Sequence, residues 1–141
     1  MKINRPNYLS KLISLKGNGM IKVVTGMRRC GKSFLLYDLF ATELLNQGVE
    51  RDCIIEVNFE SYRDRELRDP DALYQYVHSR ISDERTYYLL FDEVQMLKDF
   101  QDVLNGLLTM RNVDIYVTGS NARFLSLSLI HISEPTRLLS I

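Results

Sequence analysis

Residues 26–33 read Gly-Met-Arg-Arg-Cys-Gly-Lys-Ser, and this segment constrains the fold of the chain more than any other feature. Its two glycines allow the backbone to curl so that successive N–H groups point inward at an anion. The spacing G-x-x-x-x-G-K-S is that of a phosphate-binding loop, in which the lysine reaches the β- and γ-phosphates of a nucleotide and the serine hydroxyl binds Mg²⁺. Such a loop follows a β-strand and opens an α-helix. The segment therefore predicts a strand, a loop and a helix that together hold a nucleotide phosphate.

The residues on both sides of the loop have the expected patterns. Residues 20–25 form a short apolar run with β-branched side chains, which is typical of a strand. Residues 34–47 carry leucine and phenylalanine at helical spacing, and Gly48 is a natural helix end. The free N–H groups and the positive dipole end of this helix face the same anion as the loop. The residues expected to bind the phosphates are Gly26, Met27, Arg28, Arg29, Cys30, Gly31, Lys32, Ser33 and Phe34.

The rest of the chain alternates between expected strands and helices. The expected elements are a short helix at about 8–15, strands at 21–25, 53–59, 87–91 and 114–118, and helices at 34–47, from 70 through 81 and at 98–110. Asp69 and Pro70 form a helix-start signal after a charged connection, residues 60–69, that we expect to be solvated and mobile. This alternation predicts an α/β fold with a parallel sheet, right-handed crossovers and helices on both faces.

Two acidic residues end the third expected strand, which is apolar throughout and so suits a sheet covered on both faces. Ligands of parallel sheets sit at the carboxyl ends of the strands, so Asp92 and Glu93 should converge with the phosphate loop on one crevice. Asp92 would hold the Mg²⁺ shell and Glu93 would act as general base on a water that attacks the γ-phosphate. The alternative is an acidic turn without a ligand.

A polar tip follows the fourth expected strand. Ser120 and Asn121 would lie between the Mg²⁺ site and the γ-phosphate, where either side chain could hydrogen-bond the phosphate or the attacking water. With Glu93 and Lys32 they complete the expected catalytic set. The alternative is ordinary turn chemistry, because Gly-Ser-Asn is a common turn sequence. Arg28 and Arg29 offset phosphate charge or face solvent.

Composition excludes several classes of protein. The chain of 141 residues suits one domain, and 18 basic residues balance 18 acidic ones, so no strong electrostatic footprint for nucleic acid or an anionic membrane is present. No apolar stretch approaches the roughly 20 residues of a membrane span, and the N-terminus lacks a signal-peptide core, which predicts a cytoplasmic protein. The two cysteines lack metal-ligand spacing. Cys30 lies at an expected helix N-terminus, which lowers the pKa of a thiol, so a reactive cysteine is an open alternative at this position.

With these motifs identified, the chain resembles a family of prokaryotic P-loop ATPases of the AAA type, in which the ATPase domain precedes a nuclease-like domain. The matching segments are Arg5-Pro6-x-Tyr8-Leu9, Thr25-Gly26-x-Arg28-Arg29-x-Gly31-Lys32-Ser33, Asn58-Phe59-Glu60, Leu90-Phe91-Asp92-Glu93-Val94-Gln95 and residues 114–121. The resemblance implies that Lys32 and Ser33 of Walker A, with Asp92 and Glu93 of Walker B, bind ATP and Mg²⁺. It places Ser120 and Asn121 at the sensor position. It also implies a three-layer fold with strand order 1-4-3-2 and a fifth strand beside the first.

The resemblance covers about residues 1–126 and ends there. Residues 127–141 resemble instead the translation of a transposase-based sequencing adapter. We therefore interpret residues 1–126 as a P-loop ATPase domain that is incomplete at its C-terminal end, and residues 127–141 as a non-native tail. On this interpretation the fifth strand, the second sensor, any arginine finger and the C-terminal domain of the parent protein are missing. The first strand would then be an exposed edge.

The sequence supports ATP binding and Mg²⁺-dependent ATP hydrolysis by the N-terminal part of a larger AAA-type ATPase. ATP is favoured over GTP because no Asn-Lys-x-Asp motif is visible. The alternative is a nucleotide-binding module or fragment that binds ATP without turnover. A small-molecule kinase is a weaker third option, since neither an acceptor site nor a lid is visible. The expected partner in the parent protein is its missing C-terminal domain. Assembly into an oligomer is open, nucleic acid is open but not indicated by the charge, and binding to a membrane is not expected.

Overall fold

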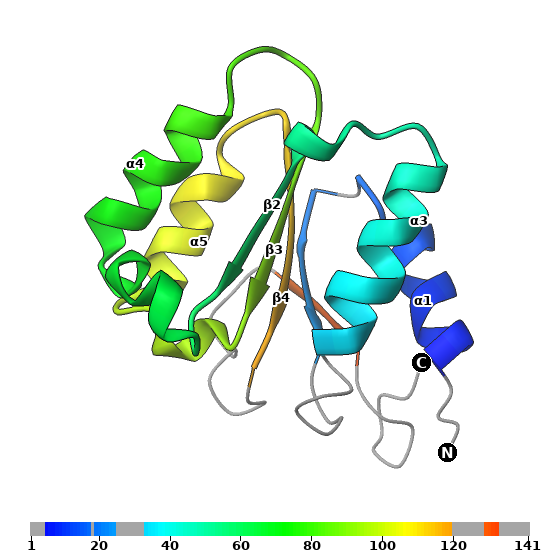
Figure 1. The fold of residues 1–141 in the computed structure, drawn as a ribbon, viewed down its shortest axis with the longest axis horizontal. Helices are drawn as coiled ribbons and strands as arrows, with labels where there is room; N and C mark the ends of the chain where they lie inside the picture. The colour runs from blue at the N-terminus through cyan, green and yellow to red at the C-terminus, as the bar shows by residue number, and fades with distance from the viewer. Residues whose placement is uncertain (1–4, 18, 25–32, 120–128, 133–141) are drawn as a thin grey trace.

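A parallel β-sheet lies at the centre of the molecule, with helices on both of its faces (Figure 1). The computed structural model describes residues 5–17, 19–24, 33–119 and 129–132. Within these described residues, five strands pair in the order β2-β3-β4-β1-β5. They are β1 (Ile21–Val24), β2 (Ile54–Asn58), β3 (Tyr87–Asp92), β4 (Val113–Thr118) and β5 (Leu129–Ile132). The expected α/β fold and the strand order 1-4-3-2 are confirmed.

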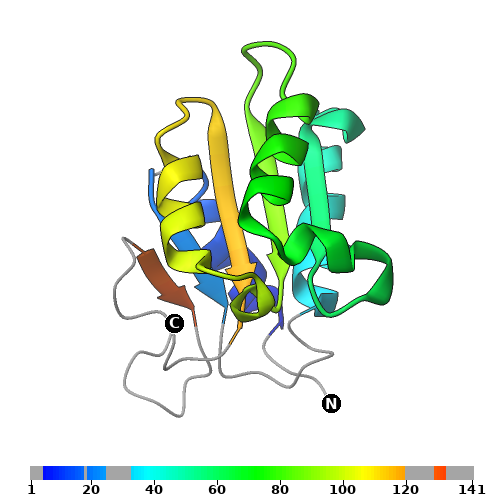
Figure 2. The same ribbon diagram turned by 90° about the vertical axis from the view of Figure 1, so that its left-hand side faces the viewer.

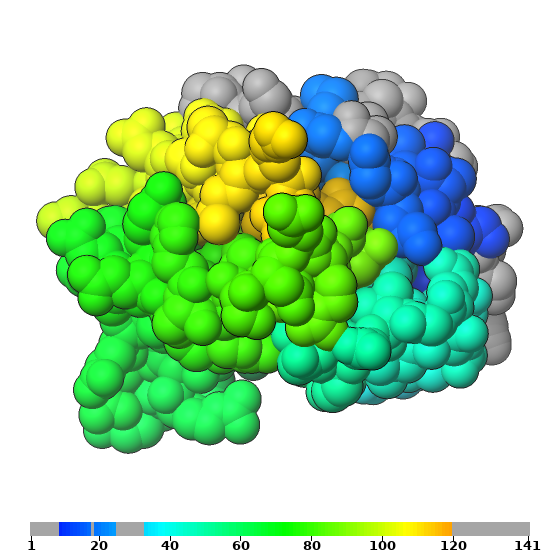
Figure 3. Space-filling view, turned by 90° about the horizontal axis from the view of Figure 1, so that it is seen from above, coloured from blue at the N-terminus to red at the C-terminus, as the bar shows by residue number. Residues whose placement is uncertain are grey.

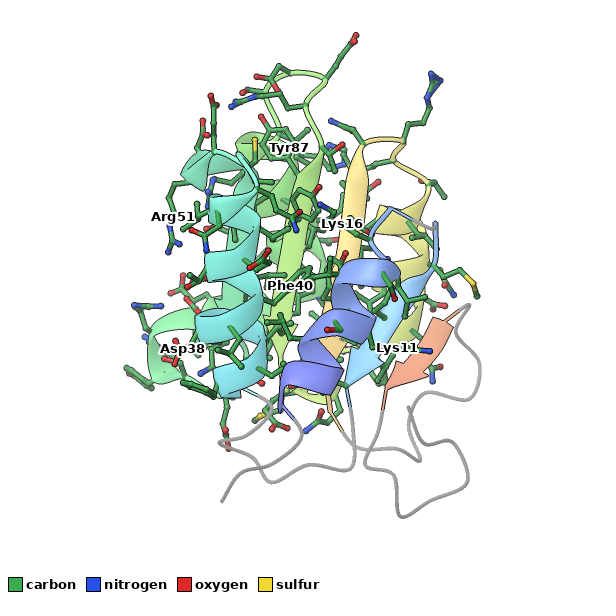
Figure 4. The ribbon with its side chains drawn as sticks, turned by 90° about the vertical axis from the view of Figure 1, so that its right-hand side faces the viewer. Lys11, Lys16, Asp38, Phe40, Arg51 and Tyr87 are labelled. Atoms are coloured by element: carbon green, nitrogen blue, oxygen red, sulfur yellow. The ribbon has the colours of Figure 1, made fainter. Side chains whose placement is uncertain are left out.

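Two layers of helices cover the sheet. The α-helices are α1 (Arg5–Ser14), α3 (Ala41–Asn46), α4 (Pro70–Arg80) and α5 (Phe100–Leu108). Helices α4 and α5 lie in front of one face (Figure 2), where Ile55, Leu89 and Ile115 are fully buried. Helix α1 and the helix that ends in α3 lie side by side over the other face (Figure 4), where Phe40 packs on Tyr116 with ring centroids 4.5 Å apart. This double cover explains why every residue of β3 is buried.

The fifth strand requires a correction to the sequence interpretation. Residues Leu129–Ile132 form β5, which pairs parallel to β1 with Ile130 opposite Lys22 and Ile132 opposite Val24. Strand β1 is therefore an inner strand in this structure, and the expectation of a missing fifth strand is wrong. The physical reason is that a ladder needs only backbone N–H and C=O groups from a run that favours strands, and Leu-Ile-His-Ile is such a run. Pairing does not address the origin of residues 127–141, so the adapter interpretation stays a prediction.

The helix after the phosphate loop contains an unexpected π-helical segment. A π-helix, η1 (Phe34–Phe40), precedes α3, where the periodicity predicts one continuous α-helix. The segment still buries Leu35, Leu36 and Phe40, so the predicted apolar face is confirmed. The helix ends where expected, because Gly48 has φ +99° and its neighbour's N–H returns to the carbonyl of Leu44 at 3.0 Å.

The connection from β2 to α4 carries more structure than expected. It contains a 3₁₀-helix, η3 (Tyr62–Arg68), that projects as a lobe in Figure 3. Asp64 accepts a hydrogen bond from the Asn58 N–H at 3.0 Å, and Arg68 Nε donates to the Phe59 carbonyl at 2.7 Å. Asp69 then caps α4 by accepting from the Ala72 N–H at 3.0 Å, which confirms the predicted start of that helix.

Two further 3₁₀ turns complete the described elements. They are η2 (Arg51–Cys53) before β2 and η4 (Val94–Met96) after β3. In the part of the chain that the structure describes, none of the helices has the length and apolar character needed to cross a bilayer.

Candidate functional site

The candidate site lies at the carboxyl edge of the sheet, where β3 and β4 end beside the helix that follows the phosphate loop. The strands are in register such that Phe91 lies opposite Val117 and Val24 lies opposite Thr118. The last residues of β1, β3 and β4 therefore reach the same edge, as a parallel sheet requires.

Ser33 and Asp92 meet at this edge, although 59 positions separate them in the chain. The Ser33 hydroxyl donates a hydrogen bond of 2.5 Å to Asp92 Oδ2, and Asp92 is only 2% exposed. A hydroxyl and a carboxylate are the hard oxygen ligands that Mg²⁺ takes, and this ion usually binds one or two such protein groups together with substrate phosphates. The donor pair therefore fits Mg²⁺. In the described part of the chain, no cluster of three or more His, Cys, Asp or Glu side chains offers a metal site made of protein alone.

Thr118, for which the sequence predicted no role, holds the acidic pair in place. Its hydroxyl donates to Asp92 Oδ1 at 2.5 Å and accepts from the Glu93 N–H at 2.8 Å, and the residue is fully buried. Both oxygens of the Asp92 carboxylate are thus engaged, one by Thr118 and one by Ser33. A threonine as the last residue of a buried strand, beside an acidic strand end, was the signal that could have found it.

Glu93 stands in a left-handed backbone conformation, with φ 56° and ψ 53°. Few residues other than glycine adopt this region, so the bond from its N–H to Thr118 stabilises a turn that is otherwise unfavourable. The side chain is 8% exposed, and its Oε1 accepts a hydrogen bond of 2.8 Å from Gln95 Nε2. The turn places a buried carboxylate directly after the residue that faces Ser33.

Several predicted site residues lie outside the described residues. They are Gly26, Met27, Arg28, Arg29, Cys30, Gly31, Lys32, Ser120 and Asn121. Their roles stay predictions. Phe34 is described, begins η1 and is 39% exposed.

A small cavity adjoins the site on the side of β2. Its volume is about 300 Å³, and it is lined by Tyr37, Glu56, Asn58, Ser61 and Arg63. The Tyr37 hydroxyl donates to the Val57 carbonyl at 2.8 Å. Burial, with Asp92 and Glu56 nearby, raises the pKa of Tyr37 well above its ordinary value, and burial also raises the pKa of Glu56. The protonated tyrosine therefore bridges the phosphate-loop helix and the end of β2.

A second polar cluster lies near the opposite end of the sheet and was also missed from the sequence. Lys22 of β1 is fully buried, and its Nζ contacts Asp114 Oδ1 at 2.6 Å. Asp114 Oδ2 accepts from the Tyr116 hydroxyl at 2.7 Å and from the Gly17 N–H at 2.8 Å. Burial lowers the pKa of Lys22, and the contact with Asp114 opposes that effect. This cluster ties the strand before the phosphate loop to β4.

Comparison with protein families gives one match over most of the chain. The model of an AAA domain matches residues 18–134, which runs past residue 126, where the sequence resemblance was expected to stop. Among curated proteins, an uncharacterized protein of Haemophilus influenzae is 38% identical over 125 residues, or 88% of this chain and 31% of that protein. An uncharacterized protein of Methanocaldococcus jannaschii is 30% identical over 106 residues, which cover 75% of this chain and 22% of that protein. The chain thus spans less than a third of the length of these relatives.

Solved structures share the fold at low sequence identity. A chain in the structure of Drosophila ORC bound to AT-rich DNA and Cdc6 matches with a TM-score of 0.58 and 14% identity, covering 92% of this chain and 53% of that one. A chain in the structure of Drosophila ORC bound to DNA matches with a TM-score of 0.53 and 12% identity, covering 92% of this chain and 89% of that one. At these identities the likeness concerns the fold.

Proposed function

Because the chain belongs to the AAA domain family, whose members have a nucleotide-binding, ATPase-type function, we propose that it binds ATP with Mg²⁺ and hydrolyses it to ADP and phosphate. The observation that carries this proposal is the contact between Ser33 and Asp92 at 2.5 Å. It joins the end of the phosphate-loop motif to the acidic end of β3, and these are the two groups that hold Mg²⁺ in P-loop enzymes. The adjacent Glu93 supplies a carboxylate for proton transfer.

Each residue has a distinct part in the proposed reaction. The loop N–H groups and Lys32 bind the β- and γ-phosphates, and Ser33 with Asp92 binds the metal ion. When bound, the ion supplies positive charge that offsets the charge developing on the phosphate oxygens. Glu93 takes a proton from the attacking water. Ser120 and Asn121 hydrogen-bond the γ-phosphate or that water.

The surrounding packing supports proton transfer by Glu93. The residue is 8% exposed, its backbone bond to Thr118 fixes the turn that carries it, and Gln95 Nε2 donates to its carboxylate at 2.8 Å. A group held in this way loses little orientational freedom when the substrate binds, which is one source of rate enhancement.

A module that binds ATP without turnover is the alternative. It is favoured by one observation: the chain spans 31% of the length of its Haemophilus relative, so residues needed for turnover can lie in the remainder of such a protein. Conformational work on an attached domain, or assembly into an oligomer, belongs to the whole protein and is part of this proposal. We place the activity in the cytoplasm. The solved neighbours are bound to DNA, but equal numbers of basic and acidic residues here give no support for DNA as a ligand.

Two substitutions test the proposal. Lys32→Ala should abolish ATP binding in titration calorimetry, whereas Lys98→Ala, at an exposed lysine, should leave the affinity unchanged. Glu93→Gln should retain binding and lower the hydrolysis rate by about 10²–10⁴-fold, the usual contribution of a general base. Glu66→Gln, at an exposed glutamate of η3, is the matched control.

The outcomes separate the two hypotheses. ATP hydrolysis by the wild type that Glu93→Gln slows by about 10²–10⁴-fold supports the ATPase. ATP binding without hydrolysis by the wild type supports the alternative. Unchanged affinity in Lys32→Ala refutes the phosphate-binding loop itself.

A further inference from the structure

Gln95 folds back onto Glu93 and holds its carboxylate. The Gln95 Nε2 group donates to Glu93 Oε1 at 2.8 Å, across only two positions of the chain. The other end of the same carboxamide, Gln95 Oε1, is buried and has no hydrogen-bond partner among the residues that the structure describes. The amide nitrogen thus makes a hydrogen bond to the proposed base, whereas the amide oxygen makes none to the described residues.

A buried acceptor without a partner is rare and calls for a specific explanation, most often an ordered water. Because the nitrogen and oxygen of a carboxamide share one small planar group, this acceptor lies close to the carboxylate that its nitrogen binds. A water at that point can donate one hydrogen to Gln95 Oε1 and the other to Glu93. Such a water donates both of its hydrogens and keeps the lone pairs of its oxygen free to attack phosphorus.

The backbone around Gln95 is held independently of its side chain. Val94 of η4 and Leu97, directly after η4, are buried in the core, and Glu93 is bonded to Thr118 through its N–H. Gln95 itself is only half-buried. Removing its amide should therefore change what happens beside Glu93 and leave the fold of this turn intact.

We propose that Gln95 is a further catalytic residue: Nε2 orients Glu93, and Oε1 holds the water that Glu93 deprotonates. This inference rests on the proposed ATPase function. In the step, the water oxygen forms a bond to the γ-phosphorus as its proton passes to Glu93, and the bond from that phosphorus to the bridging oxygen of ADP breaks. Glu93 later returns the proton to solvent or to the released phosphate. Gln95 donates and accepts hydrogen bonds but exchanges no proton.

Gln95→Met tests the inference, because methionine has a similar length and makes neither hydrogen bond. We expect kcat to fall by up to about 100-fold, the loss that a misplacement of about 1 Å can cause. ATP affinity and the unfolding midpoint should stay close to the wild-type values. Gln75→Met, at an exposed glutamine of α4, should change none of these quantities.

A double variant shows whether Gln95 acts together with Glu93. In the Glu93→Gln background, Gln95→Met should cause little further loss, because residues that act as one unit are not additive. Full additivity of the two losses overturns the inference. So does a Gln95→Met enzyme with wild-type kcat, an outcome that leaves the ATPase function standing. A wild-type chain that binds ATP without hydrolysis overturns both proposals.

A measurement without turnover completes the test. A high-resolution crystal structure of the full chain should show a water within hydrogen-bond reach of both Gln95 Oε1 and the Glu93 carboxylate. A protein group in that place overturns the inference even if hydrolysis is confirmed.

Discussion

Thr118→Val removes the hydroxyl that joins the two acidic residues to β4, with almost no change in side-chain shape. Two hydrogen bonds disappear, the 2.5 Å bond to the Asp92 carboxylate and the 2.8 Å bond from the Glu93 N–H. A bond to a charged group contributes about 1.5–3 kcal/mol, and a buried N–H left unpaired costs about 1–3 kcal/mol. Valine recovers part of this by burying an apolar group, so we expect a net loss of about 3 kcal/mol in the free energy of unfolding.

The assay is urea denaturation at neutral pH, with two control variants. Thr118→Ser retains the hydroxyl and loses one methyl group, so it should cost about 1 kcal/mol. Thr109→Val removes a hydroxyl that bonds the Gly106 carbonyl on an exposed helix end, and should cost about 0.5 kcal/mol or less. The reasoning is refuted if Thr118→Val is no less stable than Thr118→Ser, since the hydroxyl would then contribute nothing. Thr118→Val should also need more Mg²⁺ for half-maximal activity, because Asp92 loses one of the bonds that orient it.

Two other predictions concern buried groups away from this hydroxyl. Lys22→Met leaves the Asp114 carboxylate buried without its cation and should lower the free energy of unfolding by about 3–5 kcal/mol in urea denaturation. The double change Lys22→Met with Asp114→Asn should restore part of the loss, and an equal loss in both variants would contradict the ion-pair account. Tyr37 has a pKa raised by burial, so its contribution is complete below the unfolded-state pKa of about 10 and is lost as the pH rises above that value. Wild-type stability should therefore fall more steeply than that of Tyr37→Phe between about pH 9 and pH 11, and parallel curves would argue against a raised pKa.

The elements of the fold were predictable wherever local patterns decide them. The apolar run that became β3 is buried on both faces, and Asp69 caps α4 as its position before Pro70 predicts. The convergence of Ser33 and Asp92 followed from a general rule about parallel strand ends. These features depend on residue type, spacing and strand direction, all of which are visible in a single sequence.

The features that escaped prediction depend on partners far away in the chain. Lys22 reads as one polar residue in a short strand, and only the β1–β4 pairing reveals Asp114, 92 positions later, as its counter-ion. Thr118 looks like any β-branched residue until the ends of β3 and β4 are placed side by side. Strand β5 was missed because the origin of its residues was judged from their resemblance to an adapter, whereas the ladder depends on backbone groups.

Strand β4 is bonded to its neighbours through side chains at both of its ends. Asp114, near its start, binds Lys22 of β1, and Thr118, its last residue, binds Asp92 and Glu93 at the end of β3. Asp114 and Thr118 are four residues apart, which is about 13 Å of extended backbone. An ion pair thus fixes β4 to β1 near one end of the strand, and hydroxyl hydrogen bonds fix it to β3 at the other end. Sliding β4 by one residue along β1 would break the Lys22–Asp114 contact, and sliding it along β3 would break the Thr118 hydrogen bonds. The central strands should therefore keep their register during a nucleotide cycle.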